Sequence, residues 1–413
     1  MENTIEKKEG FTRYQKLIIF ILAFVQFTVV LDFMVLSPLG EQLLRELHIN
    51  TKQFGLLVAS YAFSAGISGI LSAGFADKYD RKKFLLFFYA GFLIGTLLCG
   101  IAPNYYFLLF ARIITGIFGG VISSVSFAII TDLFALEKRG RVMGFVQSAF
   151  ALSQVIGIPV GLYLASEYGW HSPFLTIVTV SFVVGVLIMI FMKPIIAHLE
   201  NKTERKAFAH LLHTLTRRNY IKGFAATALL ATGGFMLMPF GSTFSLHNLK
   251  ITNRELQMVY FFTGLCAGGF GPLTGLLADK IGKFKVFWIG SAWSMTIIAI
   301  YTQLGVTPVW VVIVVSVLLF IGISSRMITA SALMSAVPEP QDRGAFMGIN
   351  SSVQQLSGGI ASIIAGLIVV QAPDKKLLHY DTLGYVVIVA MVITIGMMFI
   401  INLHIQHKLQ KKA

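Results

Sequence analysis

The sequence predicts an all-α membrane protein in which twelve transmembrane helices form two pseudo-symmetric bundles of six, with both termini in the cytoplasm. Hydrophobic residues make up 56% of the 413 residues and charged residues only 13%, whereas roughly a quarter of a soluble domain is charged. Apolar runs of about 20 residues, enough to cross a hydrocarbon core of ~30 Å, recur along the whole chain. A loop motif also repeats between the two halves.

The apolar runs place the expected helices along the chain. The spans are 17–38, 54–76, 84–102, 105–130, 142–165, 174–192, 221–245, 256–278, 286–304, 309–332, 346–370 and 383–403. Basic residues precede the first span, as in a secretory signal peptide. Its apolar stretch exceeds the ~7 to 15 residues of a signal core, however, and no small-residue cleavage site follows. We therefore expect 17–38 to be the first transmembrane helix.

The basic residues determine the expected orientation. The net charge of +14 would suit a nucleic-acid-binding protein, but most of the 33 Lys and Arg residues lie in the termini and in alternate loops, on the side of the N-terminus. Cytoplasmic segments of membrane proteins carry this excess. We therefore expect the chain to contact a lipid bilayer and no nucleic acid, as a multi-pass protein of the inner (plasma) membrane.

Nothing in the sequence predicts a cofactor, a metal site or an enzyme. There is no phosphate-binding loop of the G-x-x-x-x-G-K-[ST] form, so ATP is not the expected energy source. His198, His210 and His213 cluster in the central loop but lack metal-ligand spacing with any Cys or carboxylate. Cys99 and Cys266 lie inside spans and are expected to pack, not to form a disulfide framework. No nucleophile and base fall into a recognisable motif.

The longest break between spans, 193–220, is rich in Lys, Arg and His and divides the chain into two sets of six helices, 1–192 and 221–413. We interpret it as a basic cytoplasmic linker. Self-comparison supports this division, because the segment 73–83 (AGFADKYDRKK) aligns with 275–285 (GLLADKIGKFK). Two similar bundles can rock against each other around a site at the membrane midplane, which a transporter needs and a channel does not.

The second copy of the repeated loop carries a family resemblance. The segment 279–283 (DKIGK), with Gly275 four residues before it, resembles the signature between helices two and three, and eight and nine, of the major facilitator superfamily. The resemblance covers the whole chain. In the first half Ala73 and Asp80 stand where the family has Gly. The resemblance implies the major facilitator fold, a small-molecule substrate and a protein that acts as a monomer.

Two further motifs resemble the drug/proton antiporter branch of that family, which includes multidrug and sugar efflux proteins. Arg112 and Gly116 on the fourth span match the R-x-x-Q-G motif, with Thr115 at the Gln position. On the fifth span, Gly157, Pro159 and Gly161 resemble the Gly-Pro helix-packing motif of proton-driven exporters, although Ile158 separates the Gly from the Pro.

By family analogy the repeated loop is a conformational latch. An Asp at the end of the second or eighth span would bind a neighbouring helix N-terminus or a basic residue of the next inner loop through charge-assisted hydrogen bonds. The alternative is a basic turn that serves only topology, but topology has no use for an Asp that recurs in both halves. The latch candidates are Asp77, Lys78, Arg81 and Arg139 in the first half and Asp279, Lys280, Lys283 and Arg343 in the second.

Only three charged residues lie well inside the spans, namely Asp32, Arg112 and Arg326. Each costs at least ~2.5 to 3.5 kcal/mol at the bilayer centre, so each is a candidate functional residue. At 1.5 Å per residue, Asp32 lies about 9 Å and Arg112 about 10 Å below the outer ends of their spans. An ion pair would neutralise both charges. Asp32 is then the candidate proton carrier, and the alternative is a permanent salt bridge between two helices.

Arg326 has no carboxylate on its own span. If it faces the cavity, the site has a spare positive charge and favours an anionic or zwitterionic substrate; if it bonds backbone carbonyls, it is structural. Adaptable apolar residues and polar residues within spans are further substrate-binding candidates, although plain packing and cross-helix hydrogen bonds are alternative roles. They are Gln26, Tyr61, Gln147, Gln154, Phe235, Met236, Asn350 and Gln354.

These expectations combine into one functional hypothesis, a proton-coupled exporter of a small amphipathic solute that works by alternating access. Two alternatives stay open: a uniporter or symporter for a metabolite or lipid-like solute, and a sensor or scaffold that transports nothing. Retained intramembrane charges argue against the scaffold, because such a protein needs no buried charge.

Overall fold

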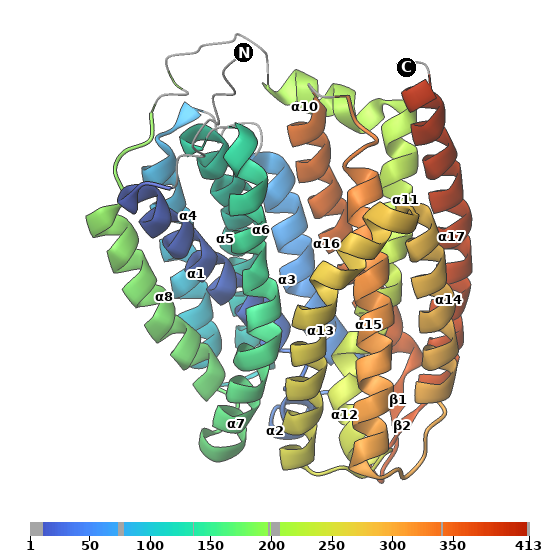
Figure 1. Cartoon of the computed structure of the whole chain (residues 1–413). Coiled ribbons are helices and arrows are strands. Elements are labelled where there is room, and N and C mark those ends of the chain that lie inside the picture. The colour runs from blue at the N-terminus through green and yellow to red at the C-terminus, as the bar shows by residue number, and fades with distance from the viewer. Residues whose placement is uncertain are drawn as a thin grey trace.

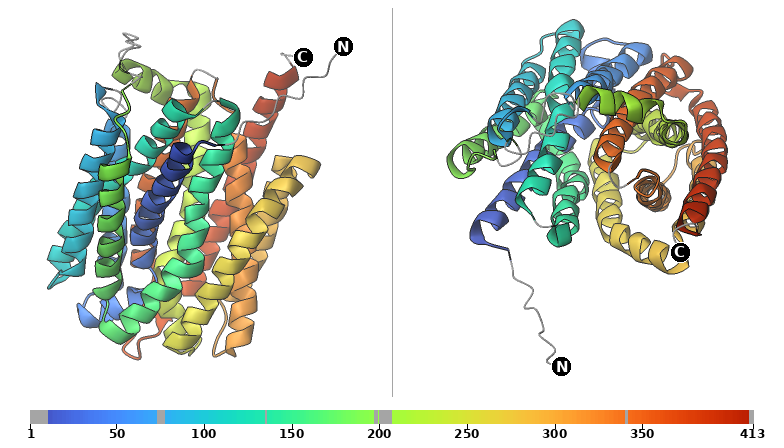
Figure 2. Two further views of the ribbon diagram at one scale, coloured as in Figure 1. Left: turned by 60° about the vertical axis from the view of Figure 1, so that its left-hand side comes forward. Right: turned by 90° about the horizontal axis from the view of Figure 1, so that it is seen from above.

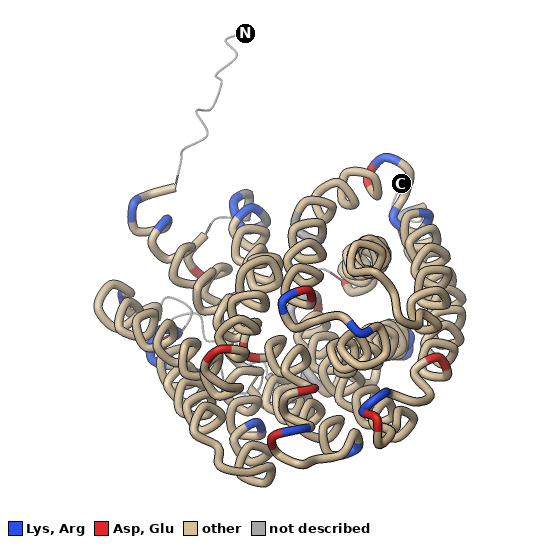
Figure 3. The backbone as a smooth tube through the Cα atoms, turned by 90° about the horizontal axis from the view of Figure 1, so that it is seen from below, with Lys and Arg blue, Asp and Glu red and all other residues tan. Residues whose placement is uncertain are grey.

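The computed structural model describes residues 11–72, 78–134, 136–196, 199, 207–339 and 342–410. Within these residues, twelve helices are long and apolar enough to cross a membrane, which confirms the predicted fold class. The first helix begins and the last one ends at the same end of the molecule (Figure 1). We call this end the termini end and the opposite one the far end. Charged residues are sparse over the helices (Figure 3).

The first half folds into the left-hand helices of Figure 1. Its elements are α1 (Arg13–Val35), α2 (Gly40–Glu46), α3 (Thr51–Ser72), α4 (Arg81–Gly100), α5 (Tyr105–Leu133), α6 (Leu136–Leu152), a π-helical turn (Ser153–Gly157), α7 (Ile158–Tyr168) and α8 (Ser172–Phe191). Thr12 begins α1 with a capping box to Gln15, and the Asn104 side chain accepts a hydrogen bond from the Phe107 amide at the start of α5. Such caps satisfy amides that have no partner inside the helix.

The second half folds into the right-hand helices. Its elements are α10 (Ala207–Thr216), α11 (Arg218–Leu237), a 3₁₀ turn (Met238–Phe240), α12 (Gly241–His247), α13 (Asn253–Ile281), α14 (Lys283–Tyr301), α15 (Val309–Met334), α16 (Arg343–Ile368), β1 (Val370–Gln371), β2 (Leu377–Leu378) and α17 (Tyr380–Gln410). The two strands pair antiparallel, Val370 opposite Leu378, and form a small hairpin at the far end (Figure 1).

Three short elements were not predicted from the sequence. The helices α2 and α10 and the β1–β2 hairpin are all shorter than the apolar runs that mark a membrane span. The helix α10 lies within the segment expected to be a linker, at the termini end (Figure 1). Asp77 and His198 lie outside the described residues, as does the side chain of Arg343.

The two bundles meet along two seams. One seam joins α3 to α16, and the other joins α13 to α7 and the π-helical turn. Glycine permits the close approach in the first seam: a Cβ on Gly55 would lie 2.6 Å from the Ser362 carbonyl oxygen, and a Cβ on Gly366 would lie 2.6 Å from that of Thr51. Seen from the termini end, the first and second halves lie side by side (Figure 2).

The hydrophobic core is shared at the far end and divided at the termini end. Among the described residues one cluster draws on both bundles, with Leu36 and Phe54 packed in the same cluster as Phe240 and Ala361. Two other clusters belong each to a single bundle, apart from Ile70 of α3, which packs against the second-half cluster. The far end is therefore the end at which apolar packing holds the two bundles together.

Candidate functional site

Asp32 and Arg112 form a buried ion pair at the centre of the first bundle. The Nη1 atom of Arg112 on α5 donates hydrogen bonds to Asp32 Oδ2 at 2.8 Å and to the Asp32 carbonyl oxygen at 3.3 Å. Thr96 on α4 donates to the other carboxylate oxygen, Oδ1, at 3.2 Å. Both charged side chains are closed off from solvent. The ion pair that helix geometry predicted is therefore present in the structure.

Aromatic rings connect this pair to the second bundle. The Arg112 guanidinium lies over the Tyr61 ring of α3, 4.5 Å from its centroid. Tyr61 contacts Phe33 of α1 with centroids 5.2 Å apart, and Phe33 contacts Phe235 of α11 at 5.8 Å. A cation over an aromatic face is stabilised by the ring's electrons. Phe235 thus reaches the immediate neighbour of Asp32 from across the interface between the bundles.

The Gly-Pro segment holds α1 in place. A Cβ on Gly157 would lie 2.5 Å from Leu31 Cδ1, and one on Gly161 would lie 3.0 Å from Val35 Cγ2. These two glycines therefore let α7 and the π-helical turn approach the part of α1 that carries Asp32. Pro159 is near the N-terminus of α7, where a missing amide hydrogen is tolerated.

The remaining polar and apolar candidates do not gather into one site. Gln26 accepts a hydrogen bond from Ser123 at 3.0 Å, and Asn350 accepts one from Thr227 at 2.6 Å, so both link helices within a bundle. Gln154 lies in the second seam, where a Cβ on Gly264 of α13 would come within 2.8 Å of its carbonyl.

Three other candidates differ in exposure. Met236 is fully buried in the shared core, Gln354 is half-buried and Gln147 is exposed.

Arg326 lies inside the second bundle and has few partners. Its Nε donates to Ser291 Oγ on α14 at 3.0 Å, and its guanidinium carbon is 5.8 Å from the Phe287 ring centroid. Among the described residues, its Nη2 has no hydrogen-bond partner. The side chain is only 2% exposed. Neither role considered from the sequence fits fully, because it bonds a hydroxyl and not backbone carbonyls, and it is enclosed.

Two latch candidates, Arg81 and Arg139, contact residues of their own half. Arg81 pairs with Asp132 of α5 at 2.9 Å. Arg139 donates to the carbonyl oxygens of Thr131 at 2.6 Å and Phe134 at 2.9 Å, and so caps the end of α5. Lys78, Asp279, Lys280 and Lys283 make no side-chain hydrogen bond or ion pair with another described residue, and Asp279 and Lys280 are exposed.

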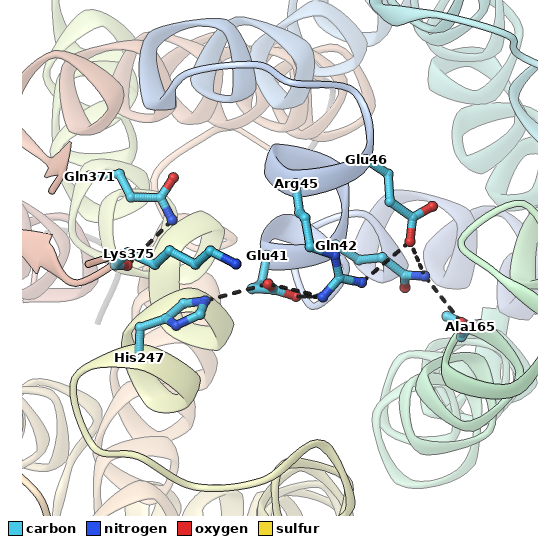
Figure 4. A network of polar contacts seen from close by, with 8 residues as sticks. All are labelled: Glu41, Gln42, Arg45, Glu46, Ala165, His247, Gln371 and Lys375. Atoms are coloured by element: carbon cyan, nitrogen blue, oxygen red, sulfur yellow. Dashed lines mark hydrogen bonds and ion pairs between the residues drawn. The ribbon is translucent and has the colours of Figure 1, made fainter. Parts of the chain in front are cut away.

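Sequence reasoning missed a contact that crosses the bundles at the far end and is an ion pair when its histidine is protonated. Glu41 of α2 lies 3.4 Å from His247 Nε2 of α12 and 3.3 Å from Arg45 Nη1. Figure 4 shows this network between the two bundles, with Gln42 reaching the Ala165 carbonyl oxygen. No sequence signal marks the pair, because Glu41 comes from the unpredicted helix α2 and His247 lies just after the expected span 221–245. It reinforces the apolar closure of the far end.

A second missed cluster ties the start of α11 to the loop before α16. Arg217 bonds Glu339 at 2.8 Å and Asp342 at 3.0 Å, and Tyr220 donates to Asp342 at 2.7 Å. All four residues belong to the second half. These contacts therefore stabilise the second bundle internally.

Comparison with known proteins identifies relatives along the whole chain. The family model for the Major Facilitator Superfamily matches residues 22–246 and again 223–413. Multidrug resistance protein 2 of Bacillus subtilis (strain 168) is 22% identical over 92% of this chain and 95% of its own. Quinolone resistance protein NorA of Staphylococcus aureus (strain MRSA252) is 24% identical over 90% of this chain and 95% of its own. A crystal structure of a D-xylose-proton symporter has the same fold, with a TM-score of 0.76, 18% identity and coverage of 92% of this chain and 97% of that one.

Proposed function

Because the chain belongs to the Major Facilitator Superfamily and is a multi-pass transporter of the plasma membrane, not an enzyme, we propose that it is a proton-coupled exporter of a small amphipathic solute. The observation that carries the proposal is the buried Asp32–Arg112 ion pair. A carboxylate enclosed at membrane depth beside a single cation can exist in two charge states, and that is what a proton carrier requires. Two drug-resistance proteins among its relatives favour export over uptake.

Protonation of Asp32 changes what Arg112 binds. In the ionised state the carboxylate accepts hydrogen bonds from Arg112 and Thr96, at 2.8 Å and 3.2 Å. A proton on the carboxylate removes the Coulomb attraction and leaves the guanidinium held by the Asp32 carbonyl oxygen and the Tyr61 ring. The contact between α1, α4 and α5 then weakens, since a charge-assisted bond is roughly twice as strong as a neutral one.

Alternating access uses the difference between the two ends of the molecule. Shared apolar packing and the Glu41–His247 pair close the far end, while separate cores at the termini end allow the bundles to part there. With the termini end in the cytoplasm, this is the state that takes up a solute from the cell interior. The latch residue Asp279, exposed in this state, would find its partner when the termini end closes.

The same geometry would fit a uniporter in which Asp32 and Arg112 only join two helices. Proton release separates the two cases. In a weakly buffered solution of purified protein, solute binding should displace a proton from Asp32, which a pH-sensitive dye detects. We expect the release in the wild type and in Asp381→Asn, an exposed carboxylate at the far end of α17, and none in Asp32→Asn. Equal proton release from Asp32→Asn would overturn the assignment of Asp32 as the carrier.

The solute for that experiment comes from a thermal-shift screen of amphipathic compounds, with a quinolone included because of the relative that is named for quinolone resistance. Each compound that stabilises the purified protein is then tested for proton release. The monomer is the unit of function in this proposal, because the Asp32 site and both seams are complete within one chain.

A further inference from the structure

Arg326 is a buried cation whose charge no described residue balances. Its bonding partners are one hydroxyl, Ser291, and one ring face, Phe287. None of the ion pairs among the described residues includes Arg326, and its Nη2 atom has no hydrogen-bond partner there. An arginine stays charged in a protein and offers five donors in a planar fork. The two N–H donors of Arg326 Nη2 are therefore unused by the described residues.

The contrast with Arg112 defines what this site lacks. Arg112 is equally enclosed, but Asp32 balances its charge at 2.8 Å. With Asp32 ionised, that pair is neutral, and Arg326 is a positive charge that no described carboxylate balances. Burial of an unpaired charge is costly, and a bound counter-ion relieves the cost. The group that complements Arg326 is accordingly an anion, and its fork geometry fits a planar carboxylate with two parallel hydrogen bonds.

Small residues bring Arg326 close to the helix that forms the bundle interface. A Cβ on Gly233 of α11 would lie 3.6 Å from Arg326 Nη1, and one on Gly290 of α14 would lie 3.6 Å from its Cγ. Two residues after Gly233 comes Phe235, which contacts Phe33 at 5.8 Å. The guanidinium therefore lies one helix away from the aromatic contact beside Asp32, and a Cβ at position 233 would be in van der Waals contact with it.

We propose that Arg326 binds the carboxylate of the transported solute, so that the substrates are amphipathic acids or zwitterions whose apolar part lies against Phe33 and Phe235. This inference rests on the proposed function as an exporter. The site is enclosed in the present state, so the solute reaches the guanidinium when α11 moves relative to α14 and α15. The proton site at Asp32 and the carboxylate site at Arg326 then lie on opposite sides of one aromatic contact, the one between Phe33 and Phe235.

Matched pairs of compounds test the inference by binding alone. The probes are 1-naphthoate and 1-naphthamide, octanoate and octanamide, and a quinolone with its methyl ester. Their affinities for the full-length purified protein are measured by thermal shift and calorimetry at constant ionic strength. In the wild type we expect at least one carboxylate to bind about tenfold more tightly than its neutral partner, as for a hydrogen-bonded charge. Arg326→Gln should abolish that preference, and Arg326→Lys should keep part of it.

The control is Arg254→Gln, which removes the same charge from an exposed position in the same half and should keep the full preference. The inference is wrong if the wild type binds no carboxylate more tightly than its neutral partner, or if Arg326→Gln keeps the preference while it remains folded. Chloride should weaken carboxylate binding more in the wild type than in Arg326→Gln, because it competes for Arg326. Equal competition by chloride in both proteins would also overturn the inference.

The binding assay separates this inference from the proposed function. Asp32→Asn should retain the carboxylate preference, because position 32 and Arg326 lie on opposite sides of the Phe33–Phe235 contact. A lost preference together with intact proton-driven transport would contradict the role of Arg326 only. A retained preference together with proton coupling in Asp32→Asn would contradict the role of Asp32 only.

Discussion

Arg112 and Asp32 are joined by a 2.8 Å bond in which the arginine side chain is 1% exposed and the aspartate side chain is fully enclosed. The pair links α5 to α1, and Gly157 and Gly161 pack against the segment of α1 that contains the aspartate. A change in the charge of Asp32 therefore alters the contacts that join α1 to α5 and that lie beside α7. This is the relationship on which the account of transport depends.

The orientation of the chain is the first prediction. The excess of Lys and Arg predicts that the termini end lies in the cytoplasm. Single cysteines at Lys283, at the start of α14, and at Lys375, in the β1–β2 turn, should differ in intact cells. We expect an impermeant thiol reagent to label position 375 and not position 283, in a background without Cys99 and Cys266. Labelling of position 283 from outside would show that the orientation is the reverse of the predicted one, and the proposed direction of transport would then be wrong.

The close seam between α3 and α16 gives a prediction about stability. A methyl group on Gly366 would lie 2.6 Å from the Thr51 carbonyl oxygen, and backbone cannot move aside as a flexible side chain can. Gly366→Ala should destabilise the protein by about 1–3 kcal/mol, as overpacking does. Gly396→Ala is the control, because nothing lies within 4 Å of its new Cβ. It should be neutral or gain up to ~1 kcal/mol of helix propensity. Thermal unfolding in detergent measures both.

The pair between Glu41 and His247 predicts a shift in conformational equilibrium. Glu41→Gln removes a contact between the bundles at the far end, 3.4 Å long and partly exposed. A partly exposed pair contributes roughly 0.2–1 kcal/mol, so the far end should open a few times more often. Leu246 lines a pocket between the bundles at the far end, together with Gln42 and Gln257. The rate of thiol labelling at a cysteine introduced at position 246 reports this opening. Glu46→Gln, which changes contacts only to Gln42 and Arg45 of its own helix α2, should leave that rate unchanged.

The latch hypothesis predicts a kinetic effect without a binding effect. Asp279→Asn should slow solute turnover in proteoliposomes while the dissociation constant stays the same, since Asp279 is exposed and remote from the Asp32–Arg112 pair. Asp374→Asn, in the far-end turn, is the matched exposed control. An unchanged turnover rate in Asp279→Asn would remove the latch and leave the loop as a determinant of topology.

Much of the fold followed from local sequence properties. Apolar length alone gives the twelve spans, and the helix rise of 1.5 Å per residue placed Asp32 and Arg112 at one depth. The rest depends on tertiary packing. The cross-bundle partner of Glu41 lies 206 positions away in a short helix, and the π-helical turn at Gln154 departs from regular helix inside one apolar run. Arg326 illustrates the same limit, because the sequence shows a lone charge but not that it is enclosed beside α11.

The central claim is that Asp32 carries the coupling proton, and the most direct test is uphill transport in proteoliposomes. Wild type with an imposed pH gradient should concentrate the solute, and Asp32→Asn should not, although downhill exchange can continue. Because the mutation leaves Arg112 unpaired, which costs roughly 3–5 kcal/mol, the mutant must first be shown to be folded and monodisperse. Asp32→Glu, which keeps a titratable carboxylate, should restore part of the accumulation. Proton-driven accumulation by folded Asp32→Asn at the wild-type level would contradict the account.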